Sequence, residues 1–291
     1  MLPNFIIIGA AKAGTTALYH YLAEHPQVFM STLKETNFFA FGLDAKGRQL
    51  YGDPDVHRYP VQTLADYENL FANAGTAAAI GEASPIYLEC PQSAGRIRDL
   101  IPNARIICSL RHPVDRAYSN YLMYLRRRRR RVEPGRDLTP ASEWALPDSR
   151  WMQLGRYHGQ LIRYFDTFPR SNIHVSLSDD LKRDTPGVTR DLYRFLEVDP
   201  AFEPDLATPH NVGGTLGNTW LESVLTAGAL KATLEPWVPT PLANWVRRIR
   251  TRNLQPAPAL PAGLKRELTR HFADDIRQTS QLIGRNLDHW L

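Results

Sequence analysis

A short apolar run that ends in a glycine-bounded turn stands at the start of the chain. Residues 5–18 read FIIIGAAKAGTTAL. The run over 5–8 is rich in β-branched residues and stops at Gly9, which predicts a short buried strand. After Gly14 a helical pattern begins, with Leu18 and Leu22 four residues apart. Because the first N–H groups of a helix have no partner within it and the helix dipole favours negative charge there, this segment predicts an anion site.

The position of Lys12 distinguishes this predicted anion site from a Walker A loop. A Walker A loop reads G-x-x-x-x-G-K-[ST], with the lysine directly after the second glycine. Here Gly9 and Gly14 keep the glycine spacing, but Lys12 stands two residues before Gly14. The segment therefore predicts a phosphate-like ligand held by a loop that differs from Walker A. Taken alone, it is also compatible with an ordinary strand–turn–helix unit that carries a solvated lysine.

A second segment also has the pattern of a buried strand followed by the start of a helix. The apolar run 104–110, ARIICSL, predicts another buried strand, and RHPVDRAYS follows it over 111–119. Pro113 suits the first turn of a helix. Arg111 then stands at the carboxyl end of a strand, with Ser119 about two helical turns further on. An arginine fork and a hydroxyl can share one phosphate, whereas a lone arginine at a strand end often pairs with a nearby carboxylate.

Two carboxylates, Glu35 and Glu82, lie near the ends of other predicted strands. Residues 33–39 read LKETNFF, so Lys34 and Glu35 come just before two phenylalanines. Residues 81–87 read GEASPIY, and Glu82 ends another strand pattern. Without further information, the first pair reads as surface charges leading into the core. Glu82 is compatible with contact to a substrate or with a structural bond to a neighbouring loop.

Together these segments resemble the PAPS-dependent sulfotransferases, where PAPS is 3′-phosphoadenosine 5′-phosphosulfate. K-x-G-T-T resembles their 5′-phosphosulfate loop, R-x-P-x-x-R-x-x-S their 3′-phosphate site, and K-E-x-x-F-F the stretch that carries the catalytic base in glycan-type members. The resemblance covers nearly the full chain. It implies transfer of a sulfuryl group from PAPS to a hydroxyl or amine of a glycan, glycolipid or small molecule, with 3′,5′-ADP as product and no metal.

The resemblance also implies roles for individual residues. Glu35 would be the catalytic base, and Lys12 would neutralise the leaving oxygen. Lys34 and Glu82 would contact the acceptor. Binding of the nucleotide would involve Lys12, Ala13, Gly14, Thr15, Thr16, Arg111, Ser119, Gly213 and Gly214, the last two in a segment that closes over the nucleotide in the family. The chain departs from the family pattern at Ala83, where several members have lysine, and at Ser178, where many have tyrosine.

Apolar runs and helical periodicity alternate along the chain. Strands are predicted at 5–9, 27–30, 77–82, 104–110 and 172–177. Helices are predicted after Gly14 and at 61–73, 91–100, 113–128, 155–168, 187–196, 218–232 and 262–283. This alternation predicts a three-layer α/β fold with a mainly parallel central sheet and a P-loop-like phosphosulfate-binding loop, in a single domain over 1–291. Right-handed crossovers place the ends of the strands at 9 and 110 on one edge, where ligands bind.

Composition restricts the partners. The net charge of +5 suits anionic ligands or surfaces, and no nucleic-acid-binding motif is present. The arginine run 126–131 indicates a solvated helix end, or a surface that attracts an acidic acceptor or an anionic membrane. Cys90 and Cys108 do not form a disulfide framework. No secretory or transmembrane segment is apparent, so we expect a cytoplasmic protein.

Two other function classes are compatible with the sequence. A P-loop nucleoside kinase or NTPase would carry lysine directly after Gly14 and an aspartate after the strand 104–110, where this chain has Thr15 and Arg111. A non-catalytic nucleotide-binding protein could keep the same fold. The presence of both Lys12 and Glu35 argues against that class. A thermal-shift panel of 3′,5′-ADP, ADP, ATP and NAD separates the three, because a ligand that binds only the native state stabilises it.

Overall fold

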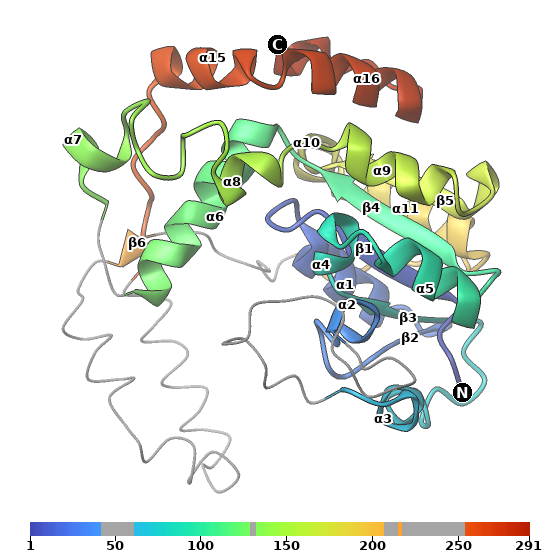
Figure 1. Cartoon of the computed structure of the whole chain (residues 1–291). Helices are drawn as coiled ribbons and strands as arrows, with labels where there is room; N and C mark the ends of the chain where they lie inside the picture. The colour runs from blue at the N-terminus through green and yellow to red at the C-terminus, as the bar shows by residue number, and fades with distance from the viewer. Residues whose placement is uncertain (42–60, 129–131, 207–214, 217–253) are drawn as a thin grey trace, which may run out of the picture. The chain divides into compact units, whose positions relative to one another are not determined.

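The computed structural model describes residues 1–41, 61–128, 132–206, 215–216 and 254–291 (Figure 1). These residues group into two compact units that interleave along the chain. The first unit comprises 1–112, 156–211 and 273–290, and the second comprises 113–155, 212–272 and residue 291. The single domain over 1–291 stays a prediction.

A parallel five-stranded sheet forms the centre of the first unit. Its strands, in spatial order, are β2 (Val28–Met30), β3 (Ala79–Ala83), β1 (Phe5–Gly9), β4 (Arg105–Leu110) and β5 (Ile173–Leu177). The five predicted strands and the parallel α/β architecture are confirmed. β1, β3 and nearly all of β4 are buried, which explains why these strands read as continuous apolar runs rather than alternating ones.

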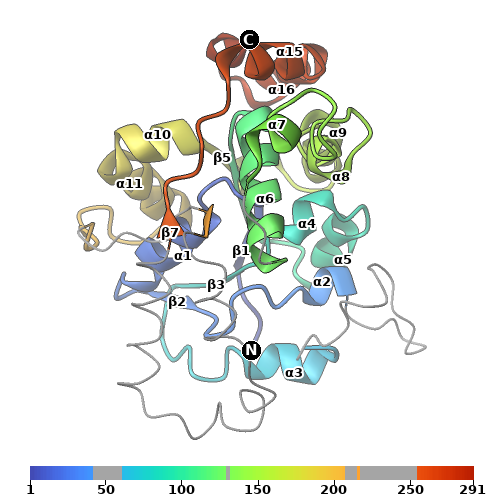
Figure 2. The same ribbon diagram turned by 90° about the vertical axis from the view of Figure 1, so that its left-hand side faces the viewer.

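Helices cover both faces of this sheet (Figure 2). α1 (Thr15–Ala23) and α11 (Thr185–Leu196) contact each other on one face. α4 (Ile86–Glu89), α5 (Ser93–Leu100) and α9 (His158–Phe165) lie on the other face, and α16 (Ala273–Ile283) packs against α9. The unit also contains α2 (Phe38–Phe41), α3 (Leu64–Asn69), α10 (Ser178–Arg183) and the 3₁₀ turns Arg170–Asn172 and Asp288–Trp290.

The strand order creates a topological switch point between β1 and β4. The chain leaves β1 toward β2 on one side of the sheet, whereas it leaves β4 toward β5 on the other side. Connections that depart in opposite directions open a crevice at the carboxyl ends of the two strands, and open α/β sheets bind ligands there. The loops that follow Gly9 and Leu110 meet at this point.

Among the described residues of the second unit, helix α6 (Pro113–Arg127) is the longest element. It contacts α8 (Arg150–Gln153) and α15 (Ala262–Arg270), and Lys265 Nζ on α15 lies 2.8 Å from Asp115 Oδ2. The buried Arg116 donates a hydrogen bond to the carbonyl of Trp151. The unit also contains α7 (Pro134–Asp137) and an antiparallel strand pair, β6 (Thr215–Leu216) with β7 (Leu254–Gln255).

The prediction of one helix over 262–283 is wrong. α15 ends at Arg270 and α16 begins at Ala273. Between them, the N–H groups of His271 and Phe272 bond to carbonyls three residues back, a tighter turn that interrupts the α-helical ladder. Asp274 and Asp275 then occupy the first turn of α16, where the helix dipole favours negative charge. The predicted helix 218–232 lies outside the described residues.

Candidate active site

The loop after β1 leads into the N-terminus of α1, where backbone N–H groups have no bonding partner within the part of the chain that the structure describes. Gly14 precedes the helix with φ 98°, and the first turn contains neither a capping side chain nor an acidic residue. The N–H groups of Thr15, Thr16 and Ala17 precede the first intrahelical bond, which runs from Leu18 N–H to the Gly14 carbonyl. The start of α1 therefore has positive polarity. The Ala13 N–H donates a hydrogen bond of 3.2 Å to the Ala10 carbonyl, and the cradle predicted from Ala13 to Thr16 stays a prediction.

Gly9 and Gly14 are each required in this loop for a different reason. At Gly9, φ is 152° and a Cβ atom would lie 2.8 Å from Leu88 Cβ, which leaves no room for a side chain. At Gly14 the left-handed φ of 98° is the stronger restriction, and Leu181 Cδ2 would lie 3.0 Å from an added Cβ. Lys12 also has a left-handed φ of 72°. The loop thus bends sharply between the strand and the helix.

Strand β4 holds this loop from the side. The hydroxyl of Ser109 donates a hydrogen bond of 2.7 Å to the Ala13 carbonyl, and the Ala10 N–H donates one of 2.7 Å to the Ser109 carbonyl. Sequence reasoning did not identify Ser109. The available signal was a hydroxyl in an otherwise apolar buried strand, where a polar group needs a specific partner.

Arg111 lies at the carboxyl end of β4, as predicted, and contacts the same loop. Its Nη1 atom donates a hydrogen bond of 3.2 Å to the Lys12 carbonyl, and its own carbonyl accepts one of 2.8 Å from the Tyr157 hydroxyl. The Arg111 Nε atom is buried and has no hydrogen-bond partner among the described residues. Arg111 as a whole is only half-buried, and a guanidinium that is fixed at one nitrogen at the end of a strand fits an anionic ligand.

For the other predicted nucleotide-binding residues, the structure does not describe their position relative to the Lys12 loop. Ser119 lies on α6 in the second unit, so its pairing with Arg111 stays a prediction. Gly213 and Gly214 lie outside the described residues. Among the residues that are described, no group of three His, Cys, Asp or Glu side chains is placed to hold a metal ion.

Glu35 lies at the same edge of the sheet as Lys12. Its N–H donates a hydrogen bond of 2.9 Å to the carbonyl of Ala83, the last residue of β3, and β3 is the neighbour of β1. The Glu35 carboxylate is 56% exposed and lies 3.0 Å from the Lys34 ammonium group. The structure thus places the predicted base at the carboxyl edge, accessible and ion-paired with the predicted acceptor lysine.

Glu82 has a very different environment. Its carboxylate has no exposed surface and accepts four hydrogen bonds, all from hydroxyl groups: Thr36 at 2.9 Å, Tyr67 at 3.0 Å, Ser84 at 2.7 Å and Tyr87 at 2.8 Å. Burial raises the pKa of the Glu82 carboxyl, although each of these hydrogen bonds acts to lower it. Of the two roles that the sequence left open for Glu82, this environment favours the structural one over acceptor contact.

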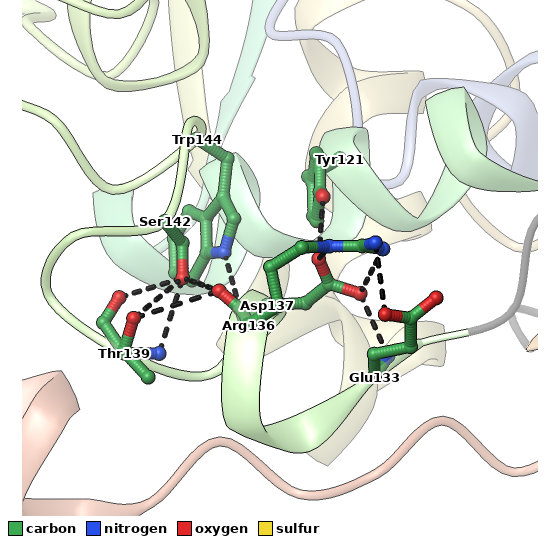
Figure 3. Close-up of polar contacts among 7 residues, drawn as sticks. All are labelled: Tyr121, Glu133, Arg136, Asp137, Thr139, Ser142 and Trp144. Carbon is green, nitrogen blue, oxygen red and sulfur yellow. Dashed lines mark hydrogen bonds and ion pairs between the residues drawn. The ribbon is translucent and has the colours of Figure 1, made fainter.

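The segment 132–144 is held around one buried carboxylate (Figure 3). Asp137 accepts hydrogen bonds from the Tyr121 hydroxyl at 2.9 Å, the Glu133 N–H at 2.7 Å and the Arg136 Nε at 2.9 Å. Burial disfavours its charged form, but these donors outweigh burial and lower the pKa of Asp137. Trp144 Nε1 donates to the Asp137 carbonyl at 2.8 Å, so backbone and side chain fix the turn together.

The comparisons with known proteins agree with this geometry. A model of the sulfotransferase family matches residues 3–204 of the chain. This chain belongs to the sulfotransferase family. The match contains the loop of Lys12, the Lys34–Glu35 pair and the end of β4, so the segments that suggested the family lie inside the matched range.

Individual relatives show the same relationship. The crystal structure of a sulfotransferase from Alicyclobacillus acidocaldarius superposes with a TM-score of 0.70 and 30% identity, covering 100% of this chain and 99% of that one. The bifunctional heparan sulfate N-deacetylase/N-sulfotransferase 4 of Mus musculus is 29% identical over 217 residues, which cover 69% of this chain and 23% of that protein. A membrane-associated sulfotransferase of Dictyostelium discoideum is 36% identical over 120 residues, 41% of this chain and 22% of that protein.

The matches cover only part of the curated relatives. The sulfotransferase chain spans less than a quarter of the length of the two curated relatives. Within its described part, we find no helix with the length and hydropathy of a membrane span. The arginine run 126–131 is described up to Arg128, whose guanidinium lies over the Tyr124 ring at 5.5 Å, and its contact with an anionic surface stays a prediction.

Proposed function

We propose that this sulfotransferase moves a sulfuryl group from PAPS to a hydroxyl or amine of a glycan, glycolipid or small-molecule acceptor. The observation that carries the proposal is the meeting of the Lys12 loop and Arg111 at the switch point between β1 and β4. One side of this point offers the N–H groups at the start of α1, and the other offers the half-buried guanidinium of Arg111. A nucleotide with phosphates at both its 5′ and 3′ positions requires two such anion sites.

Each residue has a defined task in this proposal. PAPS, when bound, supplies the sulfuryl group and leaves as 3′,5′-ADP. The N–H groups at the start of α1, with the Thr15 and Thr16 hydroxyls, hold the 5′ end, and Arg111 with Ser119 holds the 3′-phosphate. Lys12 offsets the negative charge that develops on the leaving oxygen. Because in-line transfer needs little covalent work from the protein, positioning and charge stabilisation dominate.

Glu35 handles the acceptor proton. As the acceptor oxygen or nitrogen forms its bond to sulfur, the bond from sulfur to the 5′-phosphate oxygen breaks, and that oxygen retains the electron pair. The proton of the attacking group passes to the Glu35 carboxylate. The exposure of Glu35 at the carboxyl edge supports this role, as does Lys34, which keeps a positive charge 3.0 Å from the carboxylate. In this proposal Lys34 also contacts an anionic acceptor.

Nucleotide selectivity tests the proposal. We expect the protein to bind 3′,5′-ADP at least about tenfold more tightly than 5′-ADP, a difference of roughly 1.4 kcal/mol. Arg111→Ala should remove most of this preference, because the variant lacks the fork that contacts the 3′-phosphate. Isothermal titration calorimetry of both nucleotides with both proteins measures it. Equal affinity of the wild type for the two nucleotides, or tighter binding of ATP, contradicts the proposal.

Chelation tests the charge assignment. We expect turnover to survive EDTA, because Lys12 supplies the positive charge at the leaving oxygen. Arg111, and not an aspartate, follows β4. The measurement is the rate of acceptor sulfation, followed by mass spectrometry, with and without EDTA. Loss of activity that magnesium restores would assign the charge to a metal ion instead.

A further inference from the structure

A buried network joins Glu82 to the corner of the chain that carries Glu35. Residues 35, 36 and 37 all make hydrogen bonds to the stretch 82–84. The Glu35 N–H bonds to the Ala83 carbonyl at 2.9 Å, the Thr36 hydroxyl to the Glu82 carboxylate at 2.9 Å, and the Asn37 N–H to the Ser84 hydroxyl at 3.0 Å. The Ser84 hydroxyl in turn donates to Glu82 at 2.7 Å.

The backbone of this corner needs such anchors. Glu35 has φ 63° and Asn37 has φ 56°, so two of the three residues lie in the left-handed region. Residues with a Cβ atom avoid this region, and a chain holds them there only where its surroundings fix the conformation. Thr36 and Asn37 are buried, whereas Glu35 is exposed. The anchors therefore fix the backbone on either side of a carboxylate that stays accessible.

The chemistry of Glu82 suits an anchor rather than a reacting group. An ionised carboxylate accepts about four hydrogen bonds, and four hydroxyl groups surround this one. The ion pairs among the described residues do not include Glu82, so hydroxyl dipoles compensate its charge. With no exposed surface, the carboxylate has no route to an acceptor.

We propose that Glu82 is a positioning residue for the sulfotransferase reaction, which acts through Thr36 and Ser84 to set the orientation of Glu35. This inference rests on the proposed role of Glu35 as the base. It predicts that a bond between Glu82 and the corner matters for kcat, whereas a bond from Glu82 to another part of the unit matters for stability alone. The network offers one variant of each kind.

The test compares Thr36→Val with Tyr67→Phe. Thr36→Val keeps the side-chain shape but removes the bond between the corner and Glu82, together with the contacts of the same hydroxyl with Tyr87 at 3.0 Å and Ser84 at 3.5 Å. Tyr67→Phe removes another hydroxyl donor of the same carboxylate and keeps the ring, which stacks on Phe38 at 4.5 Å. We expect Thr36→Val to lower kcat about tenfold at unchanged 3′,5′-ADP affinity, while Tyr67→Phe keeps kcat within about twofold. Thr36→Ser, which retains the hydroxyl, should restore kcat.

Hydrogen exchange gives a readout independent of turnover. The Asn37 amide should exchange faster in Thr36→Val and in Ser84→Ala than in Tyr67→Phe, compared at equal global stability from urea titrations. Equal kcat for Thr36→Val and Tyr67→Phe in folded proteins overturns the positioning role while leaving the proposed function intact. If the wild type transfers no sulfuryl group, the proposed function itself fails, and the two failures are thereby distinguished.

Discussion

Glu35→Gln should lower kcat by about 10²–10⁴-fold and leave the affinity for 3′,5′-ADP nearly unchanged. The amide has the size and shape of the carboxylate but does not accept the acceptor proton. The backbone bond from Glu35 N–H to the Ala83 carbonyl is retained, so the corner keeps its anchor. The measurements are kcat and KM at saturating PAPS, together with calorimetry of 3′,5′-ADP binding.

Glu197 provides a matched control for this substitution. It too is an exposed glutamate of the first unit, has a left-handed φ of 59°, and forms an ion pair, with Arg105. Glu197→Gln therefore reproduces the change of charge and the conformational setting away from the proposed chemistry, and kcat should stay within about twofold. The assignment of Glu35 fails if Glu35→Gln retains near-wild-type kcat, whether or not Glu82→Gln shows a catalytic defect in a well-folded protein.

The sheet could be predicted because buried parallel strands have a simple hydrophobic pattern in the sequence. Strands such as β1 and β4 are covered on both faces, so they read as uninterrupted apolar runs with β-branched residues. The antiparallel pair of β6 and β7 was not predicted, since two-residue strands carry no periodicity. The interruption between α15 and α16 escaped prediction because 262–283 contains neither proline nor a glycine near the break.

Some residues of the candidate site could be predicted from the sequence, and others could not. Lys12 and Arg111 could be predicted to meet because each follows a strand, and parallel neighbours end at one edge. Ser109, Thr36 and Tyr157 were not identified, because each acts through the hydrogen bonds of one hydroxyl group to residues far away in the sequence. Single hydroxyl groups of this kind show no spacing pattern. Only the packed structure reveals which of them hold the loops of the site.

Lys12→Met is expected to lower kcat by about 10²–10³-fold at saturating PAPS. The methionine side chain has a similar length and no charge. The Lys12 carbonyl that accepts the Arg111 bond belongs to the backbone and is retained in the variant. Negative charge on the leaving oxygen grows as the bond to sulfur breaks, so the lysine stabilises the transition state more than the bound nucleotide. The loss in kcat should therefore exceed the loss in 3′,5′-ADP affinity.

Two comparisons separate this effect from a general loss of positive charge. Lys182→Met removes the same charge from a 66% exposed side chain of the first unit, and its kcat should stay within about twofold of the wild type. Lys12→Arg keeps the charge but replaces a compact ammonium group with a planar fork, so it should recover only part of the rate. Single-turnover rates with calorimetry of product binding measure all three variants. If Lys12→Met reduces nucleotide affinity and kcat equally, or leaves kcat within about fivefold of the wild type, Lys12 binds the nucleotide without a specific role at the leaving oxygen.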